Sequence, residues 1–422
     1  MAVVLVLAAV VPGWAQPRLQ ADLSRLVVVG DSLSAAFQNG ALLGTQQVNG
    51  YAALVARQAG VDLALPLIGD PGIPNVLTLV DPGPPPVVVP ITGASVGRVD
   101  PLTQTRNLAV PGATVQDALS ARPNTPIDRL TDLVLGLPGL LPEVVFGVSG
   151  VSLSQVEWAE QLAPTTVLVW LGNNDALGAA LAGDPAVLTP VADFETAYRE
   201  VLGRLAATGA TLVVANIPDV SAIAFLTPAE DVLALVAETT GLPAAVVEAL
   251  LGITAGDRVT PDAFALIPGI LGNPLSGPLP GHVVVTAAEA ATIEATTAAY
   301  NTVIAATAVT HGAALVDVNA LVARARDRGI VVGGQRLSTA FLGGLFSLDG
   351  VHPTNTGYAV IAAEFVEVLN REFAAGLPHI NVRQIQKDDP LVLPGVGHPA
   401  SAFGHPAPDA AARLRAVLGR RP

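Results

Sequence analysis

Four short apolar runs, each followed by a loop and then by helical periodicity, constrain the fold of this chain most strongly. They lie at residues 26–29, 166–171, 211–215 and 314–318. The clearest helical stretches among them are 50–59, 194–207, 286–310 and 356–374. This alternation predicts an α/β fold with a doubly wound parallel sheet and helices on both faces. In such sheets ligands bind beyond the carboxyl ends of the strands.

Composition narrows the classes of protein to which the chain could belong. Its 422 residues suit one large domain with insertions or two small ones. The net charge is −14 and Lys387 is the only lysine, which argues against nucleic acid as a partner. The absence of cysteine excludes a disulfide framework, a thiol nucleophile and Cys-ligated zinc.

The N-terminus suggests export. An apolar run over residues 2–11 is followed by Gly13 and Ala15, small residues that fit a signal-peptidase site after Ala15. The run is too short to span a bilayer, which needs about 20 apolar residues. No basic residue precedes it, so a buried N-terminal strand stays open as the alternative. We therefore expect a signal peptide over 1–15, a secreted or cell-envelope location, and no integral membrane segment in the mature chain.

Polar motifs stand at the points where a doubly wound sheet would place its ligand. Gly30-Asp31-Ser32-Leu33 directly follows the first apolar run, Gly172-Asn173-Asn174-Asp175 follows the second, Pro111-Gly112 lies between them, and Asp349-Gly350-Val351-His352 precedes the last helix. Each motif alone could be an ordinary turn or helix cap. Because topology brings them to one sheet edge in order, we interpret them together as one site.

The chemistry of these residues is that of nucleophilic catalysis. A serine hydroxyl such as Ser32 needs a base to take its proton, and a histidine such as His352 has a suitable pKa. Asp349, three residues earlier, can orient the imidazole. The N–H groups of Gly112 and Ser32 and the side-chain amide of Asn174 can stabilise an oxyanion. Asp31 and Asp175 are expected to hold loops by accepting backbone N–H groups.

The four motifs resemble the sequence blocks of the GDSL (SGNH) hydrolase superfamily, over about residues 26–374. The resemblance implies a flavodoxin-like SGNH hydrolase fold with two insertions. It also implies a catalytic set of Ser32, His352 and Asp349, an oxyanion hole of Ser32, Gly112 and Asn174, and neither cofactor nor metal. The catalytic domain is then expected to span 16–375.

Two stretches exceed what such a fold needs. Residues 63–101 are rich in Pro and Gly and cannot be regular helix. Residues 222–285 contain a capping-box pattern from Thr227 to Glu230 and another short helix over 243–251. Directly after them, a capping box from Thr286 to Glu289 starts the long helix that returns to the sheet. Residues 376–422 form a Pro- and Gly-rich tail that we expect to be loosely ordered.

Other candidate features are weaker. The chain has no Gly-x-Ser-x-Gly elbow, which disfavours the α/β-hydrolase fold. His282, His311 and His379 lack metal-ligand spacing and are interpreted as structural or exposed, and His398 and His405 as solvated. The segment 216–219 either lines the pocket or is a turn. Trp158 and Trp170 are interpreted as core residues.

These observations predict a secreted serine esterase or lipase that acts on a small-molecule or lipid ester. Acyl transfer to an alcohol acceptor and deacetylation of carbohydrates stay open, while a non-catalytic binding module is disfavoured because all four positions keep their chemistry. The apolar insertion 222–285 could be a lid or could simply pack on the sheet. The sequence does not define the oligomeric state.

Overall fold

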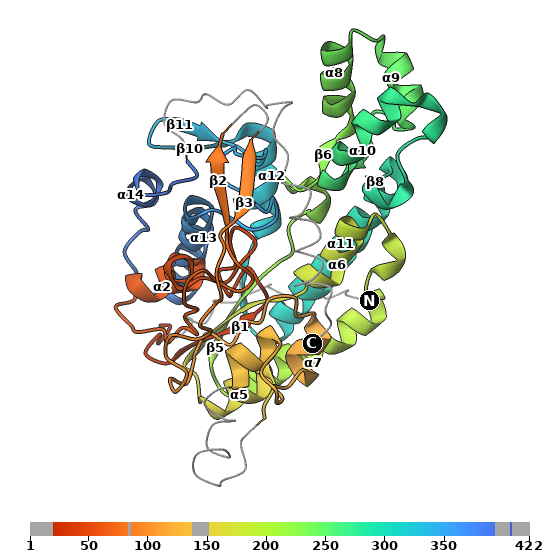
Figure 1. Cartoon of the computed structure of the whole chain (residues 1–422). Coiled ribbons are helices and arrows are strands. Elements are labelled where there is room, and N and C mark those ends of the chain that lie inside the picture. Colours follow the sequence, from red (N-terminus) through yellow and green to blue (C-terminus); the bar gives the residue numbers. More distant parts are fainter. Residues whose placement is uncertain (1–19, 83–85, 137–151, 393–405, 407–422) are drawn as a thin grey trace, which may run out of the picture.

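A parallel sheet forms the centre of the molecule in the computed structural model, which describes residues 20–82, 86–136, 152–392 and 406. Its strands are β1 (Leu26–Gly30), β4 (Thr166–Trp170), β5 (Thr211–Ala215) and β9 (Ala314–Val316), in the order β1-β4-β5-β9. All neighbours pair in parallel. The four apolar runs therefore form the sheet, as the sequence predicts (Figure 1).

A fifth segment extends the sheet beyond β1. Val28 N donates to Arg106 O (2.9 Å), Leu108 N to Val28 O (2.9 Å) and Val110 N to Gly30 O (3.1 Å). The chain thus lies on one side of β1 at 106–110 and on the other side at β4. The order in which segments are added to the sheet therefore changes sides at β1. Such a topological switch point is where doubly wound sheets open a crevice for a ligand.

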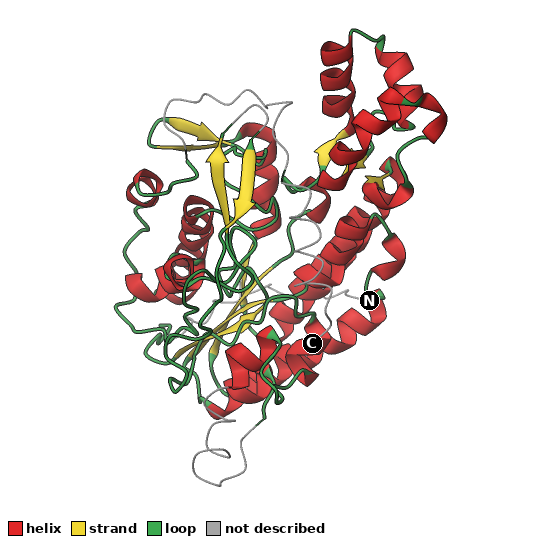
Figure 2. Ribbon diagram, in the orientation of Figure 1, coloured by secondary structure: helices red, strands yellow, loops and turns green. Residues whose placement is uncertain are grey.

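Helices cover both faces of the sheet (Figure 2). Val27 and Val29 point into a core shared with α3 (Val115–Ser120), α5 (Gln155–Gln161), α6 (Asn173–Ala182), α7 (Val191–Ala207) and α11 (Ala287–Thr310). Leu26 and Val28 point into a second core with α2 (Tyr51–Gln58), α12 (Val318–Arg328) and α13 (Asn355–Phe373). Side chains alternate across a strand, so a strand buried on both faces must be apolar throughout. The doubly wound fold and the four predicted helices, α2, α7, α11 and α13, are confirmed.

Shorter elements complete the described chain. They are the helices α1 (Gly44–Gln47) and α14 (Val382–Lys387), the helical turns η1 (Asp132–Gly136), η2 (Pro185–Val187) and η3 (Val220–Ala222), and the antiparallel pair β10 (Ile330–Val332) and β11 (Gln335–Leu337).

The first insertion forms a β-hairpin. Its strands, β2 (Leu77–Asp81) and β3 (Val87–Pro90), pair antiparallel with a bulge between Leu79 and Asp81. In the described part of 63–101 no residue is helical, as the Pro and Gly content predicts. One face of the hairpin packs in a cluster with Leu348 of the loop that carries His352.

The second insertion is a small helical arm. It contains α8 (Ala229–Thr240), α9 (Ala244–Leu251), α10 (Pro261–Gly272), the turns η4 (Pro274–Ser276) and η5 (Gly281–Val283), and a sheet of β6 (Thr227–Pro228), β7 (Arg258–Val259) and β8 (Val284–Val285). The helices bury their apolar residues in a core of their own. The arm therefore packs mainly on itself.

The two capping boxes have different outcomes. Thr286 caps α11 as predicted, since its side chain accepts from Glu289 N and Glu289 bonds back to the Thr286 backbone. The prediction at Thr227 is wrong, because α8 starts one residue later, with Pro228 in the capping position and no side-chain cap. Thr227 instead pairs with Val259 between β6 and β7.

The tail after Gly376 is also more ordered at its start than predicted. Residues 382–387 form α14, which packs on α13, and Asp389 accepts hydrogen bonds from Thr356 N and Oγ1, both 2.7 Å. Ile380 and Leu391 are buried, which the Gly and Pro content of the segment did not reveal. The proposed signal peptide, His398 and His405 lie outside the described residues.

Candidate active site

The loop of Ser32 begins where β1 ends. Asp31 Oδ1 accepts Leu33 N (3.0 Å), and helical turns follow as Ala35 N bonds Asp31 O and Phe37 N bonds Ser32 O, both 2.9 Å. The Ser32 side chain is thereby held at the carboxyl edge of the sheet and is 2% exposed. This is the loop-holding role that the sequence predicts for Asp31.

Hydrogen bonds tie this loop to the loop of Asn174. Asn173 Nδ2 donates to Asp31 Oδ2 (2.8 Å). The turn is made possible by Gly172, whose φ of +104° is a left-handed conformation that favours glycine. The first turn of α6 is thus anchored directly beside Ser32.

The loop of Gly112 is anchored to the same turn of α6. Asn174 Nδ2 donates to Ala113 O (2.9 Å), and Asp175 Oδ2 accepts Val115 N (3.0 Å). Gly112 itself has a φ of +87°. The structure therefore brings the loops of Ser32, Gly112 and Asn174 together, and Asp175 holds a loop as predicted.

His352 and Asp349 form a buried pair. Asp349 Oδ2 lies 3.0 Å from His352 Nδ1 and also accepts Gly40 N (2.8 Å), while Oδ1 accepts Val351 N and His352 N, both 2.9 Å. Four donors thus surround one carboxylate. Burial raises the pKa of Asp349, but the charge of His352 and these hydrogen bonds outweigh it, so the pKa is lowered and the carboxylate stays charged.

The other ring nitrogen of His352 is left available. Nε2 is buried and has no hydrogen-bond partner among the described residues, Ser32 included. The ring of Phe37 lies against the imidazole, with centroids 4.7 Å apart. Since Asp349 occupies Nδ1, any proton that His352 accepts must arrive at Nε2.

Asn39 and Gly40 complete this arrangement, and sequence reasoning did not find them. Asn39 N donates to Ser347 Oγ and Leu348 N donates to Asn39 Oδ1, both 3.0 Å, so the Ser32 segment and the His352 loop are clamped together. Tyr358 of α13 adds a bond from its hydroxyl to Phe37 O (2.7 Å). The Asn-Gly pair was visible in the sequence as a turn signal, but its partners are more than 300 residues away.

Gly350 sits where no side chain fits. Its φ is +74°, and an added Cβ would lie 2.6 Å from Pro406 Cγ and 2.8 Å from Phe225 N. Phe225, at the start of the second insertion, also donates its N–H to Gly350 O (2.8 Å). The His352 loop is therefore packed against both the arm and a residue of the C-terminal tail.

Two buried carboxyls support the site with raised pKa values. Burial raises the pKa of Asp31 to about 6, against the opposing hydrogen bonds of Asn173 and Leu33. Burial likewise raises the pKa of Asp175 to about 7, with Asp117 and Asp31 adding repulsion. Desolvated groups of this kind cluster at functional sites.

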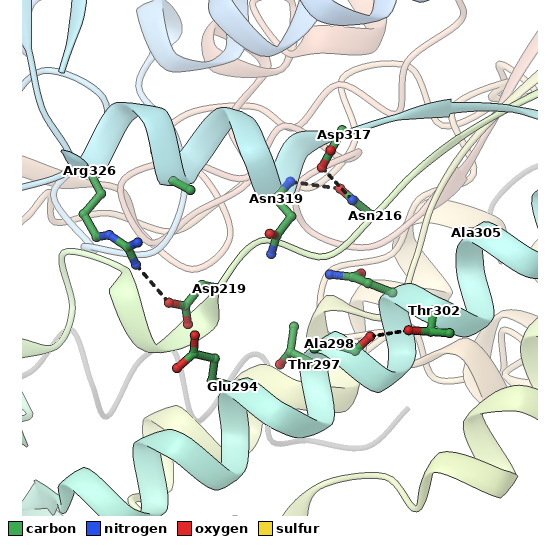
Figure 3. Close-up of a pocket in the computed structure, with 12 residues that line it drawn as sticks. Asn216, Asp219, Glu294, Thr297, Ala298, Thr302, Ala305, Asp317, Asn319 and Arg326 are labelled. Carbon is green, nitrogen blue, oxygen red and sulfur yellow. Dashed lines mark hydrogen bonds and ion pairs between the residues drawn. The ribbon is translucent and has the colours of Figure 1, made fainter. Parts of the chain in front are cut away.

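The segment 216–219 divides between two cavities. Asn216 and Asp219 line a polar pocket of about 550 Å³ between α11 and α12, with Glu294 and Arg326 (Figure 3). There Asn216 Nδ2 bonds Asp317 Oδ1 (2.8 Å) and Arg326 pairs with Asp219 (3.2 Å). None of the predicted site residues lines this pocket.

Pro218 lines a separate apolar cavity of about 70 Å³. Leu33, Val351 and Pro353, the sequence neighbours of Ser32 and His352, also line it, together with residues of α12 and α13. Pro218 is the only residue of the segment that lines this cavity, and none of the predicted catalytic or oxyanion residues lines it.

Other sequence predictions are resolved by burial. Trp170 is 1% exposed and donates Nε1 to Asn216 O (3.1 Å), and Trp158 packs, partly buried, against the first core. In the described part of the chain, no three His, Cys, Asp or Glu side chains gather into a possible metal site. No single described helix is long and apolar enough to cross a membrane. Taken together, α8 and α9 have sufficient length and apolar composition, but the pair is bent by 116°.

The family model described as GDSL-like Lipase/Acylhydrolase matches residues 26–365. No curated protein matches the chain.

Solved structures with 13–15% identity include three hydrolases. An α/β hydrolase from the metagenome of Lake Arreo, Spain, has 15% identity and a TM-score of 0.37 over 83% of this chain and 96% of its own. The psychrotrophic esterase EstA from Pseudoalteromonas sp. has 13% identity and a TM-score of 0.33 over 82% and 97%. Phospholipase A1 from Streptomyces albidoflavus NA297 has 15% identity and a TM-score of 0.31 over 83% and 100%.

The family match spans the sheet, its helices and all four motif loops. On that match, the chain belongs to the GDSL-like lipase and acylhydrolase family of hydrolases.

Proposed function

We propose that the protein is a serine hydrolase of carboxylic esters that works through an acyl-enzyme on Ser32. The observation that carries this proposal is the pairing of Asp349 with His352 Nδ1, which leaves a buried and unpartnered Nε2. An imidazole held in this way can accept a proton at Nε2. Ser32, on the loop anchored to those of Gly112 and Asn174, is the candidate hydroxyl that supplies it.

The reaction then proceeds in two steps. Ser32 Oγ attacks the ester carbonyl while His352 takes its proton, and the alcohol leaves with that proton. Water next attacks the acyl-enzyme with His352 as base, which releases the acid and restores Ser32. The oxyanion of each step is assigned to the N–H groups of Ser32 and Gly112 and to the Asn174 amide. Asp349 balances the imidazolium charge.

The acyl group is assigned to the apolar cavity beside the site. Leu33, Val351 and Pro353 line this cavity and are sequence neighbours of Ser32 and His352, which do not themselves line it. A cavity of about 70 Å³ favours short acyl groups over long chains, whose distal carbons would lie outside it.

The nucleophile is tested with a fluorophosphonate, which labels activated serines. We expect the label on Ser32, and we expect Ser32→Ala to lose both the label and p-nitrophenyl ester hydrolysis while its circular dichroism stays unchanged. Ser34 gives a matched control, since its side chain bonds Tyr51 (2.9 Å) and lies two residues away. Labelling of Ser34, or turnover by folded Ser32→Ala, would contradict the proposal.

The acyl cavity is tested with a chain-length series. Val322→Ala removes two methyl groups from the α12 wall of the cavity and should shift the preferred acyl chain to greater length. Val303→Ala makes the same change on α11, against the first core and away from this cavity. Equal chain-length profiles for the two variants would place the acyl group elsewhere.

Export is also proposed, on the basis of the apolar N-terminus and the small residues Gly13 and Ala15. The mature protein should begin at Gln16 or close to it, as N-terminal sequencing of exported material would measure. Protein retained inside the cell with its first residues intact would favour the buried-strand alternative.

A further inference from the structure

Large exposed apolar side chains are concentrated in the two insertions. Sixteen such side chains occur among the described residues, of which seven lie between residues 80 and 102 and four between 242 and 275. When a partner covers large aliphatic side chains, apolar surface is removed from water and the free energy falls. The insertions are therefore the parts of the surface most suited to a partner.

The hairpin presents an apolar outer face. Alternation along β2 and β3 turns Leu77, Leu79 and Val88 toward a cluster that includes Leu348 of the His352 loop, and the opposite side chains toward solvent. On that outer face Val80 is 64%, Val87 45%, Val89 39% and Ile91 43% exposed. The outer face of the hairpin therefore exposes four β-branched side chains to solvent.

The arm presents a second apolar surface. Leu275 is 95% exposed, Val246 42%, Leu266 38% and Leu242 36%. The 19 residues 263–281 contain no ionisable side chain. Leu, Pro and Gly thus largely take the place of the polar residues that exposed loops normally carry.

Both insertions leave the core at the candidate active site. Leu77 N, at the base of the hairpin, donates to Asn39 O (2.9 Å), and Phe225 N, at the base of the arm, donates to Gly350 O (2.8 Å). Asn39 and Gly350 belong to the two segments that are clamped around the Asp349–His352 pair. Figure 1 shows the hairpin and α8–α10 extending from the same end of the core.

We propose that the hairpin and the arm together dock the protein on a neutral or zwitterionic lipid surface, with the active site facing that surface. Exposed aliphatic side chains bind lipid by burial at the interface, and the charges beside them on the arm are mainly carboxylates such as Glu230 and Glu238. Docking goes beyond the proposed hydrolysis, because it requires no turnover.

Charge selects the kind of surface. Residues 71–97 contain no Lys, Arg or His, and Arg258 is the only basic residue in 229–281. The whole chain carries a net charge of −14. Attraction to anionic lipids requires clusters of Lys and Arg, which these segments lack. The two apolar patches also stand on separate projections, which suits a deformable lipid surface better than the continuous rigid face of a second copy of this chain.

The test is co-sedimentation of full-length Ser32→Ala protein with phosphatidylcholine vesicles, since this background separates binding from hydrolysis. We expect binding that persists at high salt and does not increase when anionic lipid is added. Leu275→Ser, and separately Val89→Ser with Ile91→Ser, should each weaken partitioning about tenfold or more, from the area of apolar surface left in water. Because these side chains are exposed, thermal stability should not change.

Val309→Ser is the matched control. Val309 is 82% exposed at the end of α11 away from the arm, and its replacement should leave vesicle binding unchanged. The proposal is overturned if phosphatidylcholine vesicles do not bind the protein or if all variants bind alike. It is equally overturned if binding requires anionic lipid, or if the hairpin and arm variants instead abolish a dimer in analytical ultracentrifugation. Hydrolysis by Ser32→Ala would refute the proposed function but leave this test intact.

Discussion

Replacing Asp349 with Asn tests whether its carboxylate prepares His352 for catalysis. The substitution keeps the size of the side chain but replaces one acceptor oxygen with a donor. Oδ1 can still accept Val351 N and His352 N, as in the native site. The amide nitrogen, however, would face Gly40 N and His352 Nδ1, which are both donors to Oδ2 in the native protein.

Two consequences can be worked out from this geometry. The imidazole can relieve the conflict by moving its proton to Nε2, but it then cannot accept the proton of Ser32, so kcat should fall by on the order of 10³ to 10⁴. Gly40 N has no such alternative and becomes a buried donor without an acceptor. That loss should lower the free energy of unfolding by about 1–3 kcal/mol.

The sign of the pH dependence follows from the lowered pKa of Asp349. A carboxyl whose folded-state pKa lies below its unfolded value of about 3.9 stabilises the protein above that value, and the stability is lost as the pH falls through the folded pKa. Asp349→Asn removes this contribution. The difference in stability between wild type and variant should therefore shrink in acid.

The assays are p-nitrophenyl butyrate hydrolysis and urea unfolding. Asp389→Asn is the control, because Asp389 is also buried and accepts Thr356 N and Oγ1 but does not contact His352. It should lose stability and keep its kcat. If Asp349→Asn kept its kcat within tenfold of wild type, the assignment of Asp349 as the residue that orients the base would be wrong.

Three further predictions follow from the site. Asn174→Ala should lower kcat by about 10² to 10³ with little change in KM, because an oxyanion donor acts mainly in the transition state; an unchanged kcat would leave Asn174 only its bond to Ala113. Asp349→Ala should reduce kcat less than His352→Ala, since Asp349 transfers no proton, and steady-state kinetics showing the reverse order would exclude His352 as the base. Asp175, with its folded-state pKa of about 7, destabilises the protein as the pH rises from about 4 to 7, by up to about 4 kcal/mol, so urea unfolding of Asp175→Asn should lack that decline.

Local sequence determined the elements of this fold and their order. Apolar runs such as 166–171 are typical of strands buried on both faces, and periodic stretches such as 356–374 are typical of helices. Alternation of the two then allowed few topologies other than a doubly wound sheet. The family motifs lie next to these strands in the sequence, so the candidate residues could be named before the structure was known.

Contacts between distant segments were decided only by the tertiary structure. Thr227 and Thr286 begin the same capping pattern, yet only Thr286 caps a helix, because pairing with Val259 draws Thr227 into a strand. The residues after Gly376 are ordered because α13 offers a surface for α14 and Thr356 offers donors for Asp389.

The clamp around the candidate base has the same origin. Gly40 N reaches Asp349 across 309 positions of sequence, and Phe37 covers the His352 ring. Local propensity carries no information about which distant donor will meet which acceptor. Periodicity therefore predicted the main strands and helices, and packing determined which segments meet and which side chains remain exposed on the hairpin and the arm.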